Sequence, residues 1–177
     1  MRAKTIFYIA LGVILAIAAA GQVRADELPI PKAGLWETKM SMQTPGLPSG
    51  AKAIETNDRM CMDQATAKEH RDSMIATKGD DTTCSKKEVK KTAAGYVMDS
   101  VCSNKLTGTT TISHAEITGD FNSGFTMKST FHSEGGKRAA RNGSATGSAK
   151  YLGACPAGWK PGDVEDRYSG RMSNIKN

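Results

Sequence analysis

The sequence lacks the short motifs that identify most enzymes. It contains three histidines, and none of them falls in a His-Glu-x-x-His motif. A Gly-x-Ser-x-Gly nucleophile motif is also missing, and the carboxylates are scattered along the chain. Hydrolytic and metalloprotease chemistry are therefore poorly supported. We expect a protein that is not an enzyme and needs no cofactor, with an unrecognised hydrolase as the weakest alternative.

Long apolar runs are equally scarce. One run, from Ile6 to Ala20, follows the basic residues Arg2 and Lys4 and ends close to the small-residue site at Ala25. It is shorter than the roughly 20 residues of a membrane-spanning helix and has the pattern of a cleaved secretory signal. We therefore expect residues 1–25 to be removed, leaving a soluble periplasmic protein with no stable membrane span.

Aromatic residues make up 6% of the sequence, and none is interleaved with the basic clusters around Lys86 and Lys137. Surfaces that bind nucleic acid usually combine basic and aromatic side chains. Removal of the signal also takes away three basic residues, which halves the formal net charge of +6. We expect no nucleic-acid partner.

The four cysteines form no Cys-x-x-Cys pair, which argues against redox catalysis and structural zinc and, in an exported chain, favours disulfides. A five-residue loop over Lys91–Gly95 would set Cys84 opposite Cys102, leaving Cys61 to pair with Cys155. Four cysteines allow three pairings, and a one-residue change in the loop would shift this register.

Residues 34–42 alternate as a half-buried strand does, and the strand should end at the Pro- and Gly-rich stretch TPGLPSG. A second strand is expected over 54–62. The inward face of the first strand would hold Trp36, Thr38, Met40 and Met42.

Asp63 is placed to cap a short helix with a thin apolar stripe that stops before Gly79. The rest is rich in Thr, Ser, Val and Gly, which indicates successive hairpins and a last strand over 144–152. We therefore expect one β-rich domain over 26–160. Residues 161–177 form a polar tail without apolar periodicity.

The segment Phe121–Phe125 suggests a hairpin closed by the three-residue loop Asn122-Ser123-Gly124, with the two phenylalanines paired. Continued outward, this register sets His114 directly opposite His132 on a polar face. Two imidazoles with a neighbouring carboxylate can bind zinc or copper(II). The alternative is an exposed polar pair.

Two Met-x-Met pairs, Met40 with Met42 and Met60 with Met62, place two thioethers on one face of a strand, a donor set suited to copper(I). Methionines on an inward strand face also fill gaps in a core. Because Trp36 shares the face of Met40, the core interpretation is favoured.

Taken together, Gly34-Leu35-Trp36-Glu37 soon after a signal, Cys61 before a short helix, Cys84 and Cys102, and a final Gly153-Ala154-Cys155 resemble the exported bacterial proteins grouped as domain of unknown function family 3617. Ala33 stands where the family more often has proline. The resemblance covers about residues 31–155. It implies an exported β-rich domain and supplies no activity or site residues.

These observations predict a mainly β fold, an antiparallel curved sheet or partly closed barrel with one short helix and two disulfides. The function expected is a non-catalytic periplasmic binding or envelope-associated module, whose partner is a small hydrophobic ligand or an envelope protein. A large cavity behind Trp36 would favour the hydrophobic ligand. The alternative is metal handling through His114 and His132 or the Met-x-Met pairs.

Overall fold

The computed structural model describes residues 28–43, 53–137 and 139–176. The expected signal, residues 1–25, and the TPGLPSG stretch lie outside these residues. The described chain forms ten elements: β1 (Gly34–Gln43), β2 (Ile54–Met62), α1 (Gln64–Ile75), β3 (Thr82–Thr92), β4 (Gly95–Asn104), β5 (Thr109–Gly119), β6 (Gly124–Gly135), β7 (Arg141–Gly153), β8 (Asp163–Asp166) and β9 (Met172–Asn174).

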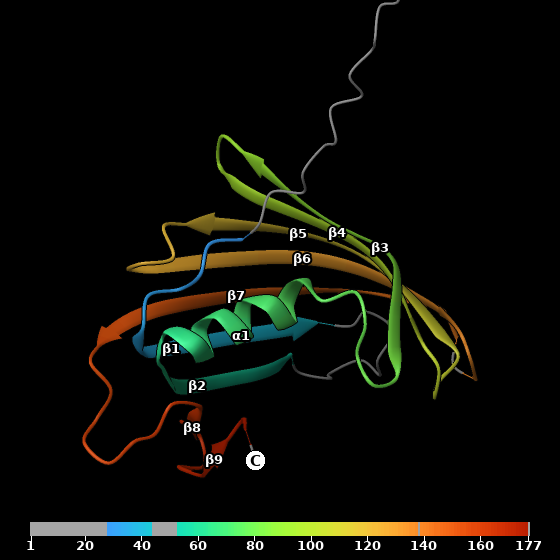
Figure 1. The fold of residues 1–177 in the computed structure, drawn as a ribbon. Helices are drawn as coiled ribbons and strands as arrows, with labels where there is room; N and C mark the ends of the chain where they lie inside the picture. The colour runs from blue at the N-terminus through green and yellow to red at the C-terminus, as the bar shows by residue number, and fades with distance from the viewer. Residues whose placement is uncertain (1–27, 44–52, 138, 177) are drawn as a thin grey trace, which may run out of the picture.

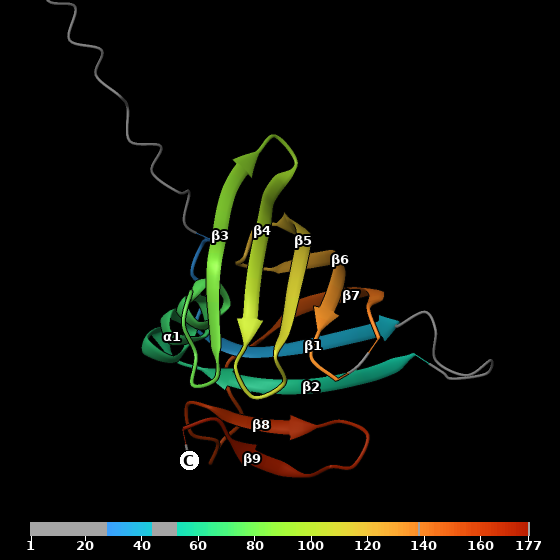
Figure 2. The ribbon, with the colours of Figure 1, turned by 90° about the vertical axis from the view of Figure 1, so that its right-hand side faces the viewer.

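All nine strands belong to one antiparallel sheet in the order β3-β4-β5-β6-β7-β1-β2-β8-β9. The sheet is curved, and it is not closed because β3 and β9 stand at opposite ends of the order. Of the two expected architectures, the curved sheet is therefore confirmed. Figure 2 shows β3 and β4 running almost crosswise to β1 and β2, as the twist of a long sheet requires.

The helix lies in the hollow of the sheet (Figure 1). Asp63 caps it by accepting a hydrogen bond from the Thr66 amide at 2.7 Å. Ala67 packs with Trp36, and Met74 packs against a cluster built on Ile117. The sheet thus has an inner face, which α1 covers in part, and an outer face formed by the alternate residues.

The chain before β1 is also part of the core. The side chain of Leu28 is 1% exposed and packs with Val89, Ile117 and Phe121. Its carbonyl accepts a hydrogen bond from Arg71 of α1 at 3.2 Å. Leu28 therefore fixes the start of the described chain between the helix and the sheet.

The β3–β4 hairpin forms the expected Cys84–Cys102 disulfide with a different register. Its turn has two residues, between Thr92 and Gly95, instead of the five-residue loop expected. In a hairpin with a two-residue turn, residues that pair across the strands are always an odd number of positions apart in the sequence. Cys84 and Cys102 are 18 positions apart, so this turn alone would not set them opposite each other. A β-bulge between Cys84 and Lys86 adds the unpaired residue that brings the cysteines opposite each other.

The predicted register of the β5–β6 hairpin is wrong by two residues. Gly119, rather than Phe121, pairs with Phe125. The Asp120 carboxylate accepts hydrogen bonds from the amides of Asn122 and Ser123 at 2.8 and 2.7 Å, which stabilises a longer turn. Because the shift is even, the expected inward and outward faces are kept.

Phe121 turns inward from this loop, with φ of 58° and 2% of its surface exposed. Its ring stacks on Phe125 at 4.7 Å between centroids. The buried ring helps to explain why a non-glycine residue adopts this backbone conformation, which costs about 1 kcal/mol or more.

The polar tail expected over 161–177 contains the β8–β9 hairpin, which extends the sheet. Asp58, Arg59 and Met60 of β2 pair with residues of β8. These contacts are made by backbone groups, so they leave no apolar alternation in the sequence. The second disulfide, Cys61–Cys155, ties the end of β2 to the segment after β7 and completes the expected pairing.

Candidate functional site

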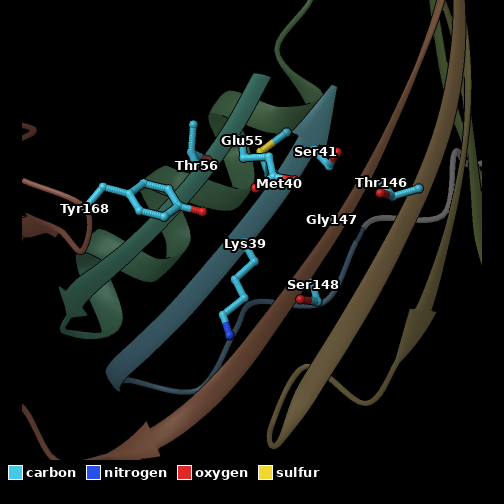
Figure 3. Close-up of a pocket in the computed structure, with 9 residues that line it drawn as sticks. All are labelled: Lys39, Met40, Ser41, Glu55, Thr56, Thr146, Gly147, Ser148 and Tyr168. Carbon is cyan, nitrogen blue, oxygen red and sulfur yellow. The ribbon is translucent and has the colours of Figure 1, made fainter. Parts of the chain in front are cut away.

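The outer face carries three adjoining open pockets that cross the strands. The first has a volume of about 340 Å³. Outward side chains of β1, β2 and β7 surround it, and Figure 3 shows Tyr168 reaching in from the β8–β9 turn. Met40 and Gly147 also line this pocket, although the strand alternation assigns their positions to the inner face. The outward lining residues are Lys39, Ser41, Glu55, Thr146 and Ser148.

The second pocket continues from the first across β7, β6 and β5. Thr146 belongs to both pockets, and this one measures about 280 Å³. Glu116 and Lys128 stand opposite each other in the register, so the pocket holds one charge of each sign. Its lining is completed on the outer face by the short hydroxyl side chains of Thr130 and Ser144.

The third pocket, of about 420 Å³, shares His114 and Thr130 with the second and continues to β4 and β3. Here the lining combines the apolar side chains of Val101 and Ile112 with charged and amide groups. We call the three pockets together the outer trough. It runs from Tyr168 to Lys86 across the middle of the sheet.

Both histidines of the third pocket are held by side-chain partners. His114 Nδ1 lies 2.8 Å from Asp99 Oδ1, and His132 Nδ1 lies 2.7 Å from Asn142 Oδ1. The hydrogen bond with His114, assisted by the charges of His114 and nearby lysines, holds the pKa of Asp99 below its usual range. These contacts fix the orientation of both rings.

The predicted placement of the two histidines directly opposite each other is wrong. His114 pairs with Thr130, and His132 pairs with Ile112, so the imidazoles lie on a diagonal in one pocket. Their Nε2 atoms approach different carboxylates, Glu116 at 4.0 Å and Glu134 at 3.5 Å. Across the described ranges, no group of three or more His, Cys, Asp or Glu residues is arranged to hold a metal ion.

The two Met-x-Met pairs lie at opposite ends of the β1–β2 hairpin. Met60 and Met62 pack around Trp36, where Met62 is 4% exposed. Met40 lies opposite Thr56, four residues along β2 from Met60, or about 13 Å at the rise of a strand. The core interpretation is therefore confirmed for Met60 and Met62 and wrong for Met40 and Met42, which are 39% and 37% exposed.

The space behind Trp36 is occupied by side chains. Met62, Ala67 and Ala149 pack against the indole, whose Nε1 donates to the Lys32 carbonyl at 2.7 Å. Phe125 and Tyr151 meet the ring at 5.9 and 5.6 Å between centroids. Trp36 is thus a core residue, and the inner face at this end is filled with side chains.

Sequence reasoning missed Tyr168, because it treated the last residues as a tail. The signal available was the turn sequence Asp166-Arg167-Tyr168-Ser169-Gly170, in which aspartate and glycine are typical turn residues. The trough itself could not be found, because its lining comes from strands that are far apart in the sequence.

Residues 31–155 match the model of a family described as protein of unknown function (DUF3617). No curated protein and no solved structure matches the chain. Within the described residues, no helix combines the length and apolar character needed to cross a membrane. The β8–β9 hairpin, with Tyr168, lies beyond the matched range. Since the match covers most of the sequence, the chain belongs to the DUF3617 family.

Proposed function

We propose that this protein is an exported binding module without catalytic activity, and that its ligand is an extended polar chain held in the outer trough. The observation that carries the proposal is the continuity of the trough. Shared residues, Thr146 at one junction and His114 with Thr130 at the other, link three pockets across the sheet. An extended ligand can occupy all three at once.

The scaffold around the trough supports this function. The lining side chains stand mainly on strands of a nine-stranded sheet, and strands position binding groups more rigidly than loops do. Two disulfides stabilise the same sheet, as suits an oxidising compartment outside the cytoplasm. A hydrophobic ligand behind Trp36 is disfavoured because side chains occupy that space.

The proposal can be tested by NMR on the exported protein, with two uncharged polar probes: chitohexaose and a Ser/Gly decapeptide acetylated at its N-terminus and amidated at its C-terminus. We expect at least one probe to shift the amides of Thr130, Thr146 and Lys39 together, since these residues span the trough. A Thr146→Arg substitution should abolish the shifts by filling the junction between two pockets.

The matched control is Thr118→Arg. Thr118 is also an exposed threonine on the outer face, where it hydrogen-bonds to Thr126 at 2.8 Å, and it does not line the three pockets. Equal losses in both variants, or no shift of trough amides at millimolar concentration with these probes, cellohexaose, dextran or heparin, would overturn the proposal.

A further inference from the structure

We infer that the ligand of the outer trough is a neutral glycan, and that Tyr168 is the aromatic platform on which one of its sugar rings stacks. The inference rests on the proposed function of the trough. It adds the chemical class of the ligand and assigns a binding role to a residue outside the range matched by the family.

Tyr168 is the exposed aromatic side chain of the trough. It is 66% exposed and lines the first pocket beside Glu55 and Thr56. By comparison, Trp36 and Phe121 are 1% and 2% exposed, and Phe131, which lines the third pocket, is partly buried. Figure 3 shows the Tyr168 ring directed from the β8–β9 turn toward β1. An exposed ring at the end of a polar groove suits the apolar C–H face of a sugar.

The backbone that carries Tyr168 is held by several hydrogen bonds. The Asp166 carboxylate accepts from the amides of Tyr168 and Ser169 at 2.8 and 3.0 Å, and the Asp166 carbonyl accepts from Gly170 at 2.7 Å. The Arg167 amide donates to the Asn57 carbonyl of β2 at 2.8 Å. A ring on a fixed backbone loses less freedom when it binds a ligand.

The charges of the trough balance, which disfavours a polyion. Each pocket contains one lysine and one carboxylate, so an anionic or cationic chain would meet one repelling charge for every attracting charge and gain no net attraction. A neutral polyol meets hydroxyl groups that both donate and accept hydrogen bonds. The six charged residues are Lys39 with Glu55, Lys128 with Glu116, and Lys86 with Asp99.

An extended peptide fits the trough less well than a glycan. Peptides bind sheets mostly by adding a strand at a free edge, where backbone groups are unpaired. The middle of the trough instead crosses β4, β5, β6, β7 and β1, each of which is paired on both sides, while its two ends lie on β2 and on the edge strand β3. Its floor therefore has few backbone groups to offer, and its side chains supply the hydrogen bonds.

The test measures the affinity of the full exported protein for chitohexaose, cellohexaose and dextran by calorimetry, with heparin and the Ser/Gly decapeptide as comparison probes. At least one neutral glycan should bind. Tyr168→Ala should weaken that binding by about fivefold or more, the effect of losing an aromatic contact, whereas Tyr168→Phe should stay within about twofold. Spectra of both variants should match the wild type outside the turn, because the side chain is exposed.

The outcomes separate the two proposals. In one outcome a glycan binds, Thr146→Arg abolishes the binding, and Tyr168→Ala leaves it unchanged. The stacking role of Tyr168 is then refuted, and the binding role of the trough is supported. If heparin or the peptide shifts the trough amides and no glycan does, the glycan class is refuted. If none of the probes perturbs the trough, the proposed function is overturned as well.

Discussion

The two ends of β1 follow the same alternation and have different surroundings. Trp36, at the start of the strand, is 1% exposed, whereas Met40 and Met42 on the same face are 39% and 37% exposed. The first end lies under α1, where Ala67 contacts Trp36. The methionines lie further along the hairpin, opposite Thr56 and Ile54 of β2.

Alternation along a strand therefore indicates which way a side chain points, while its burial depends on what covers it. In this protein the cover over Trp36 comes from Ala67 of α1, and Leu28 fills the neighbouring cluster around Ile117. The covered end also holds the Cys61–Cys155 disulfide, since Cys61 pairs with Leu35. Most of the stability should be concentrated there.

The largest effect should come from removing the Cys61–Cys155 disulfide. It closes a loop of sequence separation 94, and the chain-entropy relation gives about 4–5 kcal/mol for a loop of this length. The control is the Cys84–Cys102 disulfide, with separation 18 and an expected cost of about 3 kcal/mol. Urea unfolding of the two double Cys→Ser variants measures both, and a larger cost for the Cys84–Cys102 pair would contradict this ranking.

The next largest effect is the difference in stability loss between substitutions at the two ends of β1. Trp36→Ala should lower the free energy of unfolding by about 3–5 kcal/mol, because it leaves a cavity under α1. Met42→Ala should cost about 1 kcal/mol or less, because Met42 is partly solvated already. The two variants can be compared in the same urea titration. Similar losses would show that the Met42 end is covered as well as the Trp36 end.

A smaller effect is expected at the start of α1. Asp63→Ala removes the acceptor of the Thr66 amide and should lower Tm by about 2–4 °C. Asp63→Asn keeps an acceptor and should recover most of the loss. Thermal unfolding followed by circular dichroism measures both. An unchanged Tm in the alanine variant would mean that the cap contributes little to holding the helix over Trp36.

The smallest expected effect is on the stability of the protein at low pH, and it comes from Asp120 in the turn that contains Phe121. Hydrogen bonds from Ser123 and Asn122 lower the pKa of Asp120 to about 2. Since the folded pKa lies below the unfolded value of about 3.9, this stabilisation is complete above pH 4 and is lost as the pH falls toward 2. Asp120→Asn should therefore reduce the slope of stability between pH 4 and 2.

Asp166→Asn is the matched control, because that carboxylate also accepts amide hydrogen bonds in a turn, but in the outer β8–β9 hairpin. Urea midpoints at several pH values distinguish the two variants. If Asp166→Asn reduced the slope of stability against pH more than Asp120→Asn did, the acid-sensitive turn would be the one in the β8–β9 hairpin and not the one beside the core.

The sequence was sufficient for β1 and α1 because their signals are local, whereas it missed β8 and β9 and reached the Cys84–Cys102 pair through the wrong turn. Trp36 with its period-2 neighbours predicts β1, and Asp63 predicts the start of α1. The register of β5–β6 was not accessible, since it depends on how the Asp120 carboxylate closes the turn. The outer trough depends on pairings across many strands, and Tyr168 reaches it only because β8 pairs with β2.

The bulge beside Cys84 also bears on how the hairpin can change in evolution. Its unpaired residue and the two-residue turn together make up the even separation of the cysteines. A deletion at the bulge can therefore be offset by an insertion at the tip, and the reverse also holds. The disulfide constrains the total number of residues between the two cysteines. It does not constrain how many of them lie at the bulge and how many at the turn, so neutral variants can differ in this division.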